Sequence, residues 1–265
     1  MNSKLHLYAV LLVICSLIPI GTGAYVTSQA TGRQPVSRGI LDAVVHKDLA
    51  VAVGVVALGL AVWRRRDPRG SFLLGTAAAF FALEGWVELL GLPLLHASIA
   101  PLVFATFVVI AEVTSSSWSE TPKPVEDRAA PALRFFAIAS PPLILLQITL
   151  GAAYRHKLIG LLPHITGAMA VALPILALTM LILQRHPEDR RLCAAATWLT
   201  SIFLTQVVLG VTSFMLPLLK ASPIVVIAVT ASHVVAGSLT LAANVVLSMR
   251  VQRSVYPAPG STNTK

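Results

Sequence analysis

Charged residues and cysteines are scarce in this sequence. Asp, Glu, Lys and Arg make up 12% of its 265 residues, against 56% hydrophobic residues, whereas soluble domains carry about 25% charged residues. With a mean hydropathy of +0.80, this composition predicts an integral membrane protein. The two cysteines, Cys15 and Cys193, lie inside apolar runs. A disulfide framework is therefore excluded, and neither thiol has the spacing of a metal ligand.

Basic residues exceed acidic ones and give a net charge of +9. They fall in short clusters between apolar runs, so membrane topology explains them better than nucleic-acid binding does. Assigned to alternating sides of the membrane, 14 of the 20 lysines and arginines lie on one side and 6 on the other. The positive-inside rule then predicts a multi-pass protein of the inner (plasma) membrane with both termini in the cytoplasm.

Eight apolar runs are long enough, at about 20 residues each, to cross the hydrocarbon core of a bilayer. They cover residues 5–26, 40–63, 71–92, 94–111, 133–153, 159–183, 192–216 and 223–249. The first run could also be a cleaved signal peptide, because Lys4 precedes an apolar stretch that ends in small residues. We favour a retained helix, because this run takes part in the repeat described next. The expected fold is all-α.

A Pro-rich, charged stretch at residues 115–131 divides the chain into two halves of four helices. We expect an N-terminal half (1–114), this cytoplasmic linker, a C-terminal half (132–250) and a cytoplasmic tail (251–265). Each odd-numbered run brings a glycine to its outer half, where the backbone can approach a neighbour or a ligand closely. These repeat glycines are Gly23, Gly85, Gly151 and Gly210. The sequence therefore predicts two pseudo-symmetric four-helix bundles.

Four histidines lie in the outer halves of the four even-numbered runs. A histidine within a membrane span is costly unless it has a partner, and each of these is followed four residues later by a small residue on the same helix face. At about 1.5 Å per residue, all four lie roughly 24 to 32 Å from the inner ends of their runs, in one layer. Within the halves, His46 would face His96 and His164 would face His233. One such histidine alone is more often a packing residue, but the shared depth and spacing favour ligands.

Two neutral imidazoles from facing helices suit six-coordinate heme iron, and a four-helix bundle is a natural cage for the ring. Zinc or copper is the weaker alternative, because such sites usually have three or four protein ligands. Heme propionates need cationic or hydrogen-bonding partners, and Gln147 and Gln206 lie near the histidine layer. The outer cations are also candidates, although loop solvation explains them equally well: Arg33, Arg38, Lys47, Arg155, Lys157 and Lys220.

Six short motifs recur in order along the chain. They are His46-Lys-Asp-Leu-Ala50, His96-Ala-Ser-Ile-Ala100, Gln147-Ile-Thr-Leu-Gly-Ala152, His164-Ile-Thr-Gly-Ala168, Gln206-Val-Val-Leu-Gly210 and His233-Val-Val-Ala-Gly237. In the order and spacing of these motifs the chain resembles the heme A synthase, or cytochrome oxidase assembly, family. The resemblance covers nearly the whole chain, residues 5–250, and it is the order of the motifs that is specific.

The resemblance implies oxidation of the C8 methyl group of heme O to the formyl group of heme A, for use in terminal oxidases. It implies that His164 and His233 hold heme b in the C-terminal half. His46 and His96 would frame the substrate heme in the N-terminal half. The implied partners are heme O synthase and terminal oxidase subunits in a lipid bilayer. The protein would contribute ligation, orientation and a dry pocket to the chemistry of the heme.

The N-terminal half departs from the family pattern. Members have a Glu three residues before the first histidine, where this chain has Ala43. Asp42 lies about 100° further round the helix and cannot take over that geometry. The first outer loop is also short and lacks the paired cysteines of many members. Glu84, in the outer half of the third run, is the intramembrane carboxylate that we expect to act as a proton carrier or a histidine partner.

Three functional classes are compatible with these features. A heme A synthase-like oxidoreductase is the leading interpretation. A heme-binding protein of the same fold without hydroxylase activity, serving in electron transfer or oxidase assembly, is the alternative that Ala43 favours. A transporter is suggested by the internal repeat, but the sequence lacks the broken helices and midplane charges of transporters.

Overall fold

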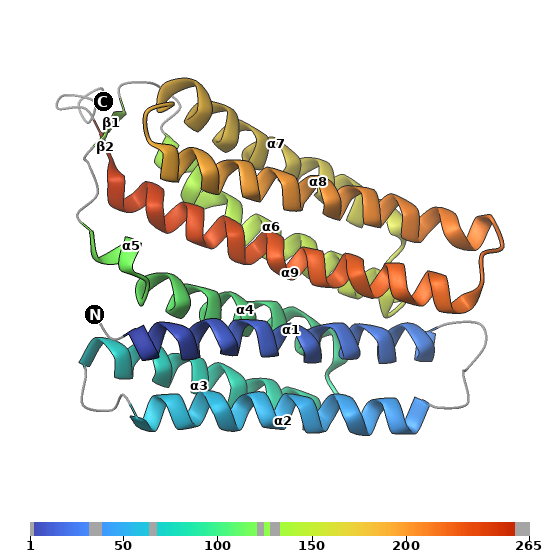
Figure 1. Ribbon diagram of the computed structural model, residues 1–265. Helices are drawn as coiled ribbons and strands as arrows, with labels where there is room; N and C mark the ends of the chain where they lie inside the picture. The colour runs from blue at the N-terminus through green and yellow to red at the C-terminus, as the bar shows by residue number, and fades with distance from the viewer. Residues whose placement is uncertain (1–2, 32–38, 64–67, 121–124, 128–132, 258–265) are drawn as a thin grey trace.

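The computed structural model of the chain describes residues 3–31, 39–63, 68–120, 125–127 and 133–257 (Figure 1). Helices dominate the described residues, as the sequence predicted. They are α1 (Ser3–Thr31), α2 (Gly39–Trp63), α3 (Pro68–Leu89), α4 (Pro93–Val113), α5 (Ser116–Ser119), α6 (Leu133–Arg155), α7 (Leu161–Arg185), α8 (Arg190–Leu218) and α9 (Pro223–Ser254). Two short strands are also present, β1 (Val125–Asp127) and β2 (Val255–Pro257).

Seven helices in the described part of the chain are long and apolar enough to cross a membrane: α1, α2, α4, α6, α7, α8 and α9. A helix satisfies its own backbone N–H and C=O groups, so an apolar chain can cross a bilayer in this form without exposing unpaired polar groups. The chain is therefore an all-α, multi-pass membrane protein. The helix α3, which carries Glu84, is not among the seven.

Contacts among the long helices fall into two sets. In the first set α1 and α3 each contact α2 and α4, and in the second α6 and α8 each contact α7 and α9. The sets meet where α9 packs against α1 and α4, and where α4 packs against α6. Figure 1 shows that α1 begins and α9 ends at the same end of the molecule, here called the terminal end. The opposite end, where α2, α4, α7 and α9 begin, is called the histidine end.

Three helices, α3, α6 and α8, finish in the same way at the histidine end. Each is followed by a residue with positive φ, namely Gly91 (66°), Lys157 (61°) and Lys220 (56°). The next backbone N–H donates to a carbonyl five residues earlier, at 3.2, 2.9 and 3.0 Å respectively, which is the Schellman arrangement. The shared cap gives structural support to the repeat that the sequence indicated.

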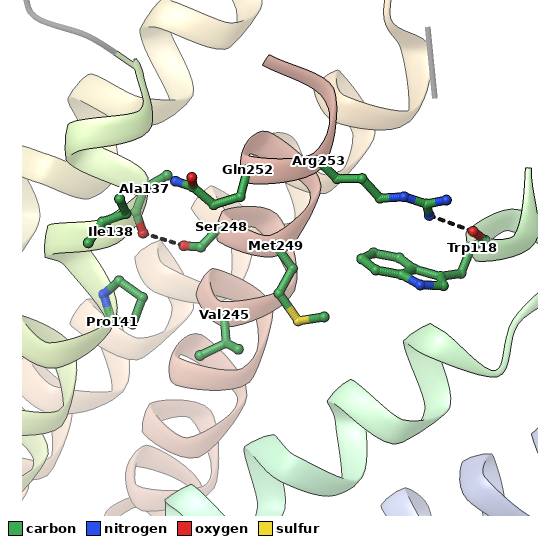
Figure 2. Close-up of a pocket in the computed structure, with 9 residues that line it drawn as sticks. All are labelled: Trp118, Ala137, Ile138, Pro141, Val245, Ser248, Met249, Gln252 and Arg253. Atoms are coloured by element: carbon green, nitrogen blue, oxygen red, sulfur yellow. Dashed lines mark hydrogen bonds between the residues drawn. The ribbon is translucent and has the colours of Figure 1, made fainter. Parts of the chain in front are cut away.

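The linker and the tail contain more regular structure than the sequence indicated. The strand β1 of the linker pairs in parallel with β2 of the tail. The Arg253 guanidinium lies 4.4 Å from the ring centre of Trp118 and donates to the Trp118 carbonyl oxygen (Figure 2). One turn earlier, Arg250 forms an ion pair with Glu112 at 2.8 Å. The end of α9 is therefore tied to the end of α4 and to the segment that follows it.

Pro141 leaves a gap in the hydrogen bonding of α6 that α9 fills. Proline has no N–H group, so the carbonyl oxygen of Ala137, four residues earlier, loses its helical donor. The Ser248 hydroxyl of α9 donates to that oxygen at 2.6 Å (Figure 2). Nearby, the Ser140 hydroxyl donates to Oδ1 of Asn244 at 2.9 Å. These polar contacts join α6 to α9 within an apolar interior, where such bonds hold membrane helices together.

We predict that Ser248→Ala lowers the free energy of unfolding by about 1 kcal/mol, because the Ala137 carbonyl loses its donor. In a Pro141→Ala background the restored backbone N–H supplies that bond, so the same substitution should cost less. Thermal unfolding of the parent, both single variants and the double variant in detergent measures the two costs. An equal cost in both backgrounds would show that the serine does not compensate for the proline.

Candidate functional site

The structure brings the four histidines together in two facing pairs at the histidine end, the pairing that the repeat predicted. In the C-terminal half, the ring centroids of His164 (α7) and His233 (α9) are 6.4 Å apart and the ring planes meet at 89°. In the N-terminal half, the rings of His46 (α2) and His96 (α4) are 6.2 Å apart, also at 89°. All four rings are partly buried. The two halves therefore contain the same arrangement of imidazoles.

Three of the four rings lie directly against the repeat glycine of the preceding helix. A Cβ atom at the glycine would lie 2.7 to 2.8 Å from the ring carbon Cε1 in each of three pairs: Gly23 and His46, Gly151 and His164, Gly210 and His233. Such a distance is too short for a side-chain carbon, so these positions need glycine. The fourth glycine, Gly85, differs, because a Cβ atom there would meet nothing within 4 Å.

In the C-terminal half, a glutamine one turn before each repeat glycine contacts the histidine ring. Nδ1 of His233 donates to the backbone carbonyl oxygen of Gln206 at 3.0 Å. Its Nε2 is therefore the acceptor nitrogen, and it lies 3.5 Å from Nε2 of the Gln206 amide. Nε2 of Gln147 lies 2.9 Å from Nδ1 of His164 and 2.8 Å from the His164 carbonyl oxygen. The side-chain Oε1 atoms of both glutamines are buried and make no hydrogen bond in the described structure.

Small residues beside the histidines make room for these glutamines. A Cβ atom at Gly237, four residues after the histidine of α9, would lie 3.1 Å from Nε2 of Gln206. A Cβ atom at Gly167, three residues after the histidine of α7, would clash with Oε1 of Gln147. The sequence predicted that small residues leave a flat surface for a planar ligand. In the C-terminal half, part of that surface instead holds the glutamine amides.

Thr22 contacts the ring of His46, which the sequence did not predict. Nδ1 of His46 lies 3.1 Å from Oγ1 of Thr22, and the Thr22 hydroxyl donates to the carbonyl oxygen of Ile18 at 3.0 Å. When the hydroxyl proton stays on that carbonyl, Nδ1 of His46 is the donor in the Thr22 contact, and Nε2 is the unprotonated nitrogen of the ring. The sequence feature that could have indicated this contact is the position of Thr22, directly before a repeat glycine. A threonine at that position does not by itself predict a contact with a histidine.

Glu84 of α3 lies against His96 of α4. Oε1 of Glu84 is 3.0 Å from Nδ1 of His96, and their side chains are 13% and 26% exposed. Glu84 stands directly before the repeat glycine of α3, the position that Thr22 occupies in α1. The structure gives Glu84 the histidine partner that we expected. Its action as a proton carrier stays a prediction.

Arg155, the expected partner of a heme propionate, connects the two sets of helices. Its Nη2 donates to the carbonyl oxygen of Ala24 and, at 2.8 Å, to the hydroxyl of Ser28, both on α1. Its Nε is buried and makes no hydrogen bond in the described structure. Desolvation and the Arg155 charge lower the pKa of the adjacent His156, which keeps that imidazole neutral at pH 7. The Nε–H of Arg155 is thus a buried donor at the histidine end.

Other residues singled out in the sequence are less closely tied to the histidine pairs. Lys47 is exposed, and Ala43 is half-buried in α2, one turn before His46. Lys157 and Lys220 form the helix caps described above. Three further side chains lie outside the described ones: Arg33, Arg38 and Asp42.

The donor set fits heme better than a bare metal ion. A metal–imidazole bond is about 2.0 Å long, so two axial imidazoles on one iron place their ring centroids about 6.3 Å apart. The observed distances of 6.2 and 6.4 Å agree with this value. In the residues that the structure describes, no group of three or more His, Cys, Asp or Glu side chains could hold a metal ion. Each pair would supply two ligands to a heme, and the macrocycle would supply the others.

A groove at the terminal end is separate from the histidines. It has a volume of about 490 Å³ and lies among α5, α6 and α9 (Figure 2). Its lining is mainly apolar, with Gln252, Arg253 and Trp118 as the more polar members. None of the histidines or their partners lines it, so it is not part of the candidate site.

No protein-family model matches the chain, and the comparison with curated proteins finds no match. The functional argument therefore depends on the geometry of the two histidine pairs and on the sequence motifs that carry them.

We predict that Gly151→Ala and Gly210→Ala each lower the melting temperature, although alanine normally stabilises a helix by about 1 kcal/mol relative to glycine. The added methyl group would force the facing histidine ring away from the helix backbone. Gly59→Ala in α2 is the matched control, because a Cβ atom there meets nothing within 4 Å, and it should raise the melting temperature. Thermal unfolding in detergent compares the three. Equal melting temperatures would contradict the contact between ring and backbone.

Proposed function

We propose that this protein is a heme A synthase-like membrane oxidoreductase, which converts heme O to heme A by oxidising the C8 methyl group to a formyl group. The observation that carries the proposal is the presence of two facing histidine pairs with centroid distances of 6.2 and 6.4 Å. These distances suit axial ligation of one heme by each pair. The order of the histidine and glutamine motifs along the chain supports the same family.

The proposed topology has eight membrane-spanning helices in two pseudo-symmetric four-helix bundles. Seven of them are long and apolar enough by themselves. α3 is the eighth, because it packs beside α2 and α4 and runs from the terminal end to the histidine end (Figure 1). The excess of basic residues at the terminal end supports cytoplasmic termini, and the proposed location is the plasma membrane.

His164 and His233 would hold heme b in the C-terminal bundle. When bound, heme supplies the one-electron redox chemistry of its iron. The backbone carbonyl of Gln206 accepts the Nδ1 proton of His233, so Nε2 would be the ligand nitrogen, in place of its 3.5 Å contact with the Gln206 amide. Gln147 would do the same for His164 if its amide turned to offer Oε1, which is buried and makes no hydrogen bond in the described structure. The Nε–H of Arg155 is the donor for a propionate.

His46 and His96 would frame heme O, the substrate, in the N-terminal bundle. Thr22 accepts the Nδ1 proton of His46, and Glu84 lies where it can accept that of His96. These contacts orient both rings, and Nε2 would be the nitrogen that meets the substrate. The apolar helices around them would limit the access of water to the reacting group. Heme O synthase and terminal oxidase subunits are the partners that would supply the substrate and receive the product.

A second function is favoured by one feature of α2. Ala43 stands where the family has a glutamate, so the N-terminal bundle lacks the acid expected one turn before His46. A heme-binding protein without hydroxylase activity, acting in electron transfer or oxidase assembly, would need the same two histidine pairs but no acid there.

We predict that the protein, purified from a host that makes hemes B and O, carries heme b and yields heme A. Acid extraction followed by chromatography and mass spectrometry identifies the pigments. A formyl heme that is absent from cells carrying an empty vector supports the synthase. Heme b alone, under conditions of turnover, would refute the synthase and support the second function.

We predict that His164→Met and His233→Met each shift or abolish a low-spin bis-histidine absorption spectrum, because each removes one axial nitrogen. His46→Ala and His96→Ala should keep that spectrum and lose formyl-heme formation. His6→Ala, at the terminal end where the ring contacts the Ala111 carbonyl oxygen, is the control and should change neither. An unchanged spectrum in both methionine variants would remove the C-terminal site from the proposal.

A further inference from the structure

We propose that Glu84 is a positioning residue that tunes His96 and gives the N-terminal heme the lower reduction potential of the two. This inference rests on the proposed function, because it concerns a heme bound between His46 and His96. It adds a functional difference between two sites whose histidine geometry is the same. It also gives a functional role to Glu84 of α3, a helix that carries none of the paired histidines.

The observation behind this proposal is the chemistry of the groups that meet the Nδ1 atoms. Oε1 of Glu84 lies 3.0 Å from Nδ1 of His96. In the C-terminal half the corresponding groups are neutral: the backbone carbonyl of Gln206, 3.0 Å from Nδ1 of His233, and the amide of Gln147, 2.9 Å from Nδ1 of His164. The same ring position therefore faces an acid in one bundle and amides in the other.

Glu84 also lies where its charge would influence a heme iron through the His96 imidazole. The Glu84 side chain is 13% exposed, and α3 packs on both α2 and α4. A carboxylate within such an apolar bundle exerts a field that solvent screens only weakly. Glu84 is on a different helix from His96, so the 3.0 Å contact connects the imidazole to α3.

A carboxylate that accepts the Nδ1 proton of a metal-bound imidazole makes the ring a stronger donor and fixes its tautomer. A stronger axial donor stabilises ferric iron over ferrous iron and so lowers the reduction potential. A neutral carbonyl or amide has a smaller effect because it carries no net charge. The iron bound by His96 is then the more readily oxidised of the two.

The first experiment measures the reduction potentials of both hemes by spectroelectrochemistry. Glu84→Gln keeps the size of the side chain and removes the charge. It should raise one potential by at least 59 mV, a tenfold change in the equilibrium constant of a one-electron couple, and leave the other unchanged. The heme that responds should be the one lost in His46→Ala. Unaltered potentials in a variant that retains both hemes would overturn the inference and leave the proposed function intact.

The reciprocal variant keeps the test decisive if Glu84→Gln does not fold. Gln147→Glu places an acid beside His164 and should lower the potential of the C-terminal heme, the one altered by His233→Met. No change in a folded, heme-bound Gln147→Glu variant would contradict the idea that an acid at Nδ1 sets the potential.

A second measurement needs no heme. In heme-free protein with ¹⁵N-labelled histidine, the His96 resonance, assigned by its loss in His96→Gln, should show the proton on Nδ1. Glu84→Ala should reduce that tautomer, whereas Thr22→Val should alter the signal of His46 instead. An unchanged His96 tautomer in Glu84→Ala would overturn the positioning role. A protein that shows the expected tautomer but binds no heme would refute the proposed function, and with it the potential difference.

Discussion

A histidine ring inside an apolar helical bundle needs a polar partner for its nitrogen atoms, and this need organises the histidine end. Hydrocarbon supplies no such partner, and an unpaired polar group within it is costly. Each Nδ1 atom meets a polar group on the helix that precedes its own in the chain. Three of the rings reach that helix because a glycine lets them lie on its backbone. Glycine, partner and ring thus form one unit, which occurs in both halves.

The two halves satisfy this need with different side chains. In α6 and α8 the partner is a glutamine one turn before the glycine, and in α1 and α3 it is the residue directly before the glycine. Both positions lie near the ring, so the fold tolerates either. The choice matters for chemistry, because the amides are neutral while Glu84 brings an acid to His96. The two halves therefore match more closely in the position of the rings than in the groups that polarise them.

The sequence predicted the parts of the structure that repeat. The long apolar runs predicted the long helices. The similar depth of the histidines in those runs predicted the pairs His46 with His96 and His164 with His233. The contact of Thr22 with His46 was not predictable, because it depends on the rotation of α1 about its axis. The use of Gly167 and Gly237 to seat glutamine amides was missed for the same reason, since spacing along one helix does not identify the side chain that a neighbour inserts. The pairing of β1 with β2 joins segments far apart in the chain and left no periodic signal.

The buried guanidinium of Arg155 makes the two halves dependent on each other. It emerges from α6, but its hydrogen bonds in the described structure go to Ala24 and Ser28 of α1. A second half inserted alone would leave this cation without those acceptors in a medium of low polarity. The halves are therefore not autonomous domains joined by a linker. The C-terminal helices therefore complete their native packing only against α1, a helix of the other half.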